Sequence, residues 1–210
     1  MTRLMDPNFQ KLSTLMSEMG DLSIQSIELA INSYLKETNP IVEVKQLSEN
    51  ITDRYHEVGD IIFNTIMKFQ PVASDFRFIR SSIEISYAFH RFGRYAYDIT
   101  LIRDKFGDIS DCKTEWLYQV SNETLSMTKD ALHSFALLDN GKANLIQMNE
   151  EYVDKLYRER IPMLIDSKDT KCALAEGLLL EYLERIADHA MHMSRAVNYI
   201  VTGKHHPEKQ

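Results

Sequence analysis

Glycine and proline are scarce in this chain, at 7 and 5 of 210 residues. β-Sandwiches and barrels need many tight turns, so this scarcity argues against them and favours a few long elements. Long apolar runs are also missing, since no segment approaches the about 20 uninterrupted apolar residues that a membrane-spanning helix needs. The first 19 residues carry Asp6, Lys11 and Glu18 among short apolar groups, so they do not read as a secretion signal.

Positive charge is in short supply as well. Lys and Arg number 24 against 31 Asp and Glu, which gives a net charge of −7. A general nucleic-acid surface and a polybasic membrane anchor both need clustered Lys and Arg, so neither direct nucleic-acid binding nor membrane insertion is expected. Apolar residues at 44% and charged residues at 26% are enough for a sizeable core in one large domain or two small ones.

Cysteine occurs twice, as Cys112 and Cys172. The two residues form no CxxC pair and no disulfide framework, so the sequence predicts two small, unpaired helix residues in a reducing compartment. Together with the absence of a leader or a spanning segment, this makes the cytoplasm the expected location.

The apolar residues recur every three or four positions, which predicts six long helices and an all-α fold. Pro71 is expected to end or sharply kink the second helix, Pro162 to kink the fifth, and Ser167 to cap the sixth. We assign every apolar stripe to packing. The predicted helices run over residues 8–37, 41–69, 73–106, 112–138 and 142–166, and from 167 to the stop at Gly203.

The third and sixth helices are similar in sequence. Residues 89–94 align with residues 183–188 at an offset of 94, and in the preceding helices Ile51 aligns with Val153. The chain therefore looks like two copies of an antiparallel three-helix hairpin. We expect the first bundle to span residues 1–108 and the second residues 109–210.

Three segments resemble one protein family. They are QPVASDFR at residues 70–77, LERIADHA at residues 183–190, and YIVTG at residues 199–203. Together and in this order they resemble the PhoU family, whose members carry a QPxASDLR-like turn, ERIGD-like segments and a final Y-x-x-x-G. The resemblance covers nearly the whole chain.

The resemblance implies two tandem three-helix bundles related by a pseudo-twofold, usually as a homodimer. It implies a negative regulator of phosphate uptake and phosphate-starvation signalling that is not an enzyme. Its partners would be the ATPase subunit of the phosphate ABC transporter and, in many bacteria, a sensor histidine kinase. It also implies metal clusters bound through (E/D)xxxD motifs.

The second half carries two such motifs. Glu150 and Asp154 share one face of the fifth helix, and Glu184 and Asp188 share one face of the sixth, with His192 one turn further on. Two such pairs on neighbouring helices make an oxygen-rich pocket suited to a cation such as Fe, Zn, Mn or Mg. We therefore predict a metal site on the outer surface of the second bundle, because the apolar face points the other way.

The first half departs from this pattern. The offsets map the four carboxylates onto Ser48, Thr52, His90 and Arg94, and Arg94 places a fixed positive charge where a cation would sit. The sequence therefore predicts one metal site rather than two.

Two other functions stay open at this point. A ferritin-like di-metal oxidase uses Glu-x-x-His motifs, and the nearest matches here are Asp53-x-x-His56 and Asp130-x-x-His133. A helical adaptor without metal is the second. The turn at residues 70–77 has a structural interpretation, with Ser74 or Asp75 as the cap of the third helix, and a functional one as part of a partner-binding surface.

Overall fold

The chain folds into six long α-helices and, over the residues described, contains no strand. The computed structural model describes residues 6–36, 38–71, 73–112 and 114–205. The helices are α1 (Asp6–Leu35), α2 (Ile41–Phe69), α3 (Ala73–Phe106), α4 (Glu115–Leu137), α5 (Ala143–Ile165) and α6 (Thr170–Thr202). The all-α prediction is confirmed. Within the described part of the chain, no helix is both long and apolar enough to cross a bilayer.

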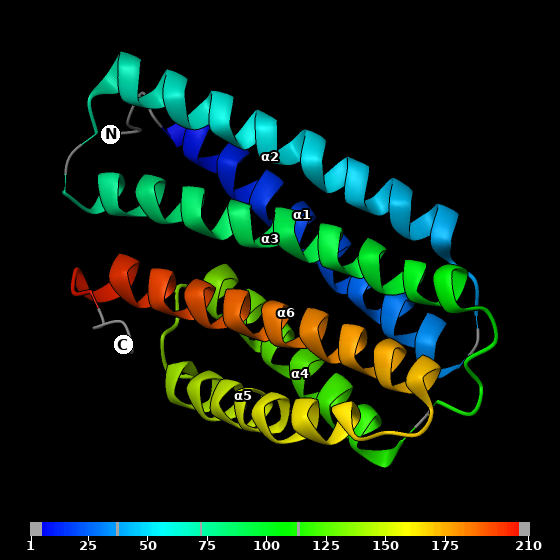
Figure 1. Cartoon of the computed structure of the whole chain (residues 1–210). Helices are drawn as coiled ribbons and strands as arrows, with labels where there is room; N and C mark the ends of the chain where they lie inside the picture. Colours follow the sequence, from blue (N-terminus) through cyan, green and yellow to red (C-terminus); the bar gives the residue numbers. More distant parts are fainter. Residues whose placement is uncertain (1–5, 37, 72, 113, 206–210) are drawn as a thin grey trace.

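The helices form two antiparallel three-helix bundles, α1–α3 and α4–α6 (Figure 1). The bundles meet through α3 against α6 and α1 against α4, whereas α2 packs only on α1 and α3, and α5 only on α4 and α6. α3 and α6 therefore run side by side through the middle, with α2 and α5 on opposite outer sides (Figure 1). This arrangement confirms the predicted tandem bundles, while the boundary between residues 108 and 109 stays a prediction.

The helix ends follow from local chemistry. Pro71 has no amide hydrogen to continue a helix, and α2 ends two residues before it. Gln70 adopts a left-handed conformation with φ 46°, and its N–H donates to the Ile66 carbonyl at 3.2 Å. Gly107 and Gly203 end α3 and α6 in the same way, each with φ 71°. α5 runs through Pro162 to Ile165.

The cap of α6 differs from the prediction. Asp169, not Ser167, is the N-cap residue, and its carboxylate accepts the Cys172 N–H at 3.0 Å. Ser167 instead exchanges hydrogen bonds with the Asp169 backbone two residues on. Ser74 lies inside α3 and Asp75 lies in its first turn, so neither is the N-cap residue of that helix. Glu37 of the predicted first helix lies outside the described residues.

The prediction of two unpaired cysteines is wrong. Cys112 and Cys172 form a disulfide, although they are 60 positions apart in sequence. The segment after α3 returns to the first turn of α6, which brings the two Cα atoms to 4.8 Å. The expectation of a reducing compartment therefore loses its support from unpaired cysteines.

The predicted stripes form one continuous core through both bundles. Its largest fully buried side chains include Tyr34, Phe89 and Phe92. The α2 stripe is buried from Val44 to Ile62 apart from the partly buried Tyr55, but its last turn emerges from the core, and Ile66 is 37% exposed. The assignment of that last turn to core packing is corrected accordingly.

Candidate functional site

The four predicted carboxylates lie on two helices that pack together, α5 and α6. Glu184 is the more buried of the α6 pair, with its side chain 24% exposed against 44% for Asp188. On α5, Glu150 is half-buried, and Asp154 is 38% exposed. The pairs thus lie in the half-buried zone beside the α5–α6 contact rather than fully in solvent.

The carboxylates of this stripe have basic neighbours. Arg158 Nη2 lies 2.9 Å from Asp154 Oδ2, Arg185 Nε lies 3.7 Å from Glu184 Oε2, and His192 Nε2 lies 3.4 Å from Asp188 Oδ1. Among the residues that the structure describes, no three His, Cys, Asp or Glu side chains gather closely enough to hold a metal ion. In this arrangement, then, the five predicted ligands do not converge on one point.

The carboxylates of the stripe affect one another electrostatically. Burial raises the pKa of Glu184, and the nearby carboxylates of Asp188, Glu181 and Asp154 raise it further against the lowering effect of Arg185. The hydrogen bond from His192 lowers the pKa of Asp188. Several carboxylates therefore act on one another here, and a cation placed among them would relieve their repulsion.

The equivalent region of the first bundle is occupied differently. Thr52 Oγ1 donates to the Ser48 carbonyl at 2.9 Å, and Arg94 pairs with Asp98 at 3.0 Å. His90 stacks on Tyr55 with ring centroids 4.9 Å apart. Burial, Arg91 and His56 lower the pKa of His90, in that order. These side chains present hydroxyls, an aromatic stack and a paired guanidinium instead of a set of carboxylates.

The two Asp-x-x-His pairs of the oxidase alternative are separated. Asp53 and His56 lie on α2, whereas Asp130 and His133 lie on α4, and these two helices do not pack on each other. Asp130 forms an ion pair with Lys142. A four-helix di-metal centre needs its ligands to project into one shared core, so these pairs do not make one.

Two of the family-like segments meet in space, a contact that the sequence reasoning did not foresee. Arg77, in the first turns of α3, donates from Nε to the Ile200 carbonyl of α6 at 3.5 Å. The Arg80 guanidinium lies 5.1 Å from the Tyr199 ring centroid. The QPVASDFR turn and the YIVTG segment therefore form one surface at the end of the molecule where α2 joins α3, at the left of Figure 1.

Exposed apolar side chains flank this same turn. Phe63, Ile66 and Met67 on α2 are 66%, 37% and 68% exposed, and Phe76 on α3 is 46% exposed. Exposed apolar side chains that gather on one part of a protein surface commonly mark an interaction site. We call these four residues the turn patch.

Comparison with known proteins identifies the fold and the family. The PhoU domain profile matches residues 16–102 and again residues 117–197, which together make up most of the chain. This chain belongs to the PhoU family. The two matches fall on the two bundles, as expected for an internal repeat of PhoU domains.

Relatives and solved structures agree with this family. The phosphate-specific transport system accessory protein PhoU homolog of Clostridium acetobutylicum is 26% identical over 97% of each chain. That of Rhizobium meliloti is 27% identical over 94% of this chain and 87% of its own. The crystal structure of PhoU from Pseudomonas aeruginosa superposes with a TM-score of 0.87 at 21% identity, covering 95% of this chain and all of that one.

Proposed function

We propose that this protein is a negative regulator of phosphate uptake and phosphate-starvation signalling that works by binding other proteins and not by catalysis. The observation that carries the proposal is the match of both bundles to the PhoU domain. The names of the relatives, which describe accessory proteins of phosphate-specific transport systems, supply the physiological setting. In this setting the protein acts in the cytoplasm.

The surface proposed for the partner is the end of the molecule that carries the turn patch. Its occupant is the ATPase subunit of the phosphate ABC transporter, and a sensor histidine kinase is a second partner. Two features support this choice. The turn patch exposes apolar side chains that the core does not use. The adjacent family-like segments are joined by the Arg77 contact, and Arg80, three residues after the first segment, lies beside Tyr199.

A deletion strain tests this proposal. Loss of the gene should raise phosphate uptake and the expression of phosphate-starvation genes in phosphate-replete medium, and the wild-type gene should restore both. Met67→Asp in the turn patch should fail to restore them, and the purified variant should lose binding to the purified ATPase subunit. Met148→Asp is the matched control, because Met148 on α5 is similarly exposed at 66%. Unchanged uptake and expression in the deletion strain would reject the proposed function.

We further propose one metal site in the second bundle, made by Glu150, Asp154, Glu184, Asp188 and His192. It would hold Fe, Zn, Mn or Mg, and binding would require Arg158 and Arg185 to swing away from the carboxylates they now contact. Long exposed arginine side chains do so at little cost, because surface ion pairs contribute about 0–1 kcal/mol. A metal-free adaptor is the competing interpretation, and it predicts full partner binding after chelation.

The homodimer implied by the family is also part of the proposal. Sedimentation equilibrium of the purified protein tests it directly. A monomer at all concentrations would remove the homodimer from the proposal while leaving the partner-binding test intact.

A further inference from the structure

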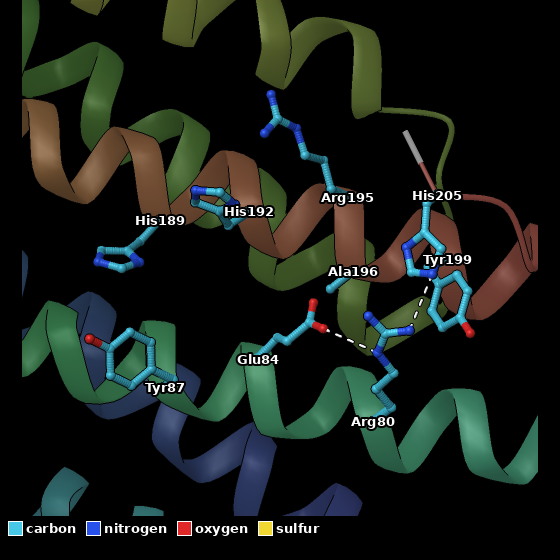
Figure 2. Close-up of a pocket in the computed structure, with 9 residues that line it drawn as sticks. All are labelled: Arg80, Glu84, Tyr87, His189, His192, Arg195, Ala196, Tyr199 and His205. Carbon is cyan, nitrogen blue, oxygen red and sulfur yellow. Dashed lines mark hydrogen bonds and ion pairs between the residues drawn. The ribbon is translucent and has the colours of Figure 1, made fainter. Parts of the chain in front are cut away.

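A cavity of about 400 Å³ opens between α3 and α6, the two central helices (Figure 2). One wall comes from the first bundle and the other from the second, so neither repeat forms the cavity alone. Figure 2 shows Arg80, Glu84 and Tyr87 on α3 with His189 and Tyr199 of α6 across this space, whereas the Arg195 side chain extends away from α3. The residues that line it are Arg80, Glu84 and Tyr87 on α3, His189, His192, Arg195, Ala196 and Tyr199 on α6, and His205 beyond it.

The lining is basic, against the net charge of −7 for the whole chain. Arg195 is half-buried and has no ion pair or hydrogen-bond partner within the described ranges of the chain. Its guanidinium is therefore available to an anion, which would be stabilised by charge-assisted hydrogen bonds. Glu84 is the single acidic side chain among the lining residues described, and it lies 3.5 Å from Arg80 Nε.

The other basic groups are held in place by their neighbours. Arg80 Nη1 lies 3.2 Å from His205 Nε2, and the His205 ring stacks on Tyr199 with centroids 4.1 Å apart. His192 is held by Asp188. Burial lowers the pKa of His189 to about 4, so at neutral pH this ring is an uncharged donor. The guanidinium groups of Arg80 and Arg195 are the permanently charged cations of this lining.

This basic lining is not imposed by the fold, because the symmetry-related positions lack it. The offset of 94 that relates α3 to α6 places Leu174 at the position of Arg80 and Leu101 at that of Arg195. It places Asp98 at the position of His192. A packing requirement would act equally on both copies of the repeat, so packing does not explain the basic residues of this cavity.

The volume of the cavity and its aromatic residues limit the class of ligand that it could bind. Small-molecule sites typically enclose roughly 300–1,000 Å³, so this cavity exceeds what a bare phosphate ion needs. Tyr87 is 46% exposed and lines this space, so it offers a flat surface to a ring (Figure 2). A phosphoryl group presents three acceptor oxygens, which suits the guanidinium of Arg80 and, once its side chain turns toward α3, that of Arg195.

We propose that the α3–α6 cavity binds a small phosphorylated molecule with a flat ring, such as a nucleotide, with Arg80 and Arg195 as the anion-binding groups. The site takes one wall from each repeat, so a bound ligand would tie the two bundles together. The inference stands on the cavity alone and does not rest on the transporter partner proposed above.

Isothermal titration calorimetry on chelator-treated protein tests this inference, because removing metal separates direct anion binding from binding through an ion. We expect ATP to bind more tightly than inorganic phosphate and than adenosine, since each of these offers only part of the recognised chemistry. Arg195→Gln should weaken ATP binding by about tenfold or more, as expected for a lost charge-assisted hydrogen bond. Arg94→Gln is the matched control, because Arg94 lies on α3 with Asp98 as its own partner.

Glu84→Gln provides a signed second test. Removing the one acidic group of the lining should tighten ATP binding, whereas a purely structural role of Glu84 would leave it unchanged or weaken it. Circular dichroism and thermal unfolding confirm that each variant is folded. No heat with ATP, or equal ATP affinity in Arg195→Gln and wild type, overturns the inference.

Discussion

Breaking the Cys112–Cys172 disulfide should destabilise the protein strongly. The bond closes a loop of 60 residues, and loop-closure entropy for that length corresponds to about 4 kcal/mol at 25 °C. For a chain of this size each kcal/mol shifts the unfolding midpoint by roughly 2–4 °C, so the expected loss in Tm is roughly 8–16 °C. Cys172→Ser is the preferred change, because Cys172 is half-buried whereas Cys112 is only 2% exposed.

The assay has three parts. Thiol titration of the unfolded, non-reduced wild type should find no free thiol, and intact mass should be two hydrogens below the reduced value. Thermal unfolding should show the same drop for Cys172→Ser as for reduced wild type, and reductant should leave the variant unchanged. Two free thiols in protein purified under air would refute the bond. A bond that forms but stabilises by less than about 1 kcal/mol would refute the entropic reasoning.

Three further changes have expected outcomes with a definite sign. Burial raises the pKa of the Glu176 carboxyl in the folded protein. The protonated carboxyl therefore contributes its full stabilisation below the ordinary pKa of glutamate, and this stabilisation is lost as pH rises through the raised pKa of the folded protein. Glu176→Gln should therefore raise Tm at pH 7 but not at pH 3. Gly203→Ala should cost about 1 kcal/mol in thermal unfolding, because φ is 71° there and the nearest neighbouring side-chain atom leaves room for the methyl group. Elemental analysis should find most metal lost from Asp188→Asn and nearly none from His90→Ala; equal losses would reject a single site in the second bundle.

Helix positions were predictable wherever local chemistry sets them. The bounds of α2 and α3 agree with the prediction because Pro40, Pro71 and Gly107 act on their own neighbours. The start of α4 was placed too early, at Cys112 instead of Glu115. Cys112 lies in a turn, with its N–H donating to the Ile109 carbonyl at 3.0 Å, and it is bonded to α6. The periodicity of apolar residues reports neither this turn nor the disulfide partner 60 residues away.

The same distinction between local and distant contacts applies to the candidate sites. The Arg158 neighbour of Asp154 is readable from the sequence, since residues four apart share a helix face. His189, His192 and Arg195 are likewise spaced by three, which already indicates one basic face on α6. What the sequence does not show is that Arg80, more than a hundred residues earlier, lines the same cavity. Which distant helices pack together is a property of the tertiary structure, so the sequence alone did not predict the cavity.

The two repeats keep one core and differ at their surfaces. Ile85, Phe89, Phe92 and Ala96 on α3 correspond at the offset of 94 to Leu179, Leu183, Ile186 and Ala190 on α6, and all eight are buried. Packing therefore preserved apolar side chains at these positions in both copies, because a polar group there would lose its solvation. The partly or fully exposed positions carry no such requirement. At the offset of 94, His90 and Arg94 on α3 correspond to Glu184 and Asp188 on α6.

This difference leaves the outward side of α6 with charged groups of both signs. Glu184 and Asp188 form its acidic part, Arg195 follows seven residues after Asp188 on the same side of the helix, and His192 lies between them, paired with Asp188 and lining the cavity. A cation on the stripe would take both Asp188 and His192 as ligands, and it would thereby change the charge and the position of a side chain in the cavity wall. The two proposed ligands would therefore be coupled through one side chain. ATP titrations of metal-loaded and metal-free protein, repeated with His192→Ala, would show the coupling as a difference in affinity that disappears in the variant.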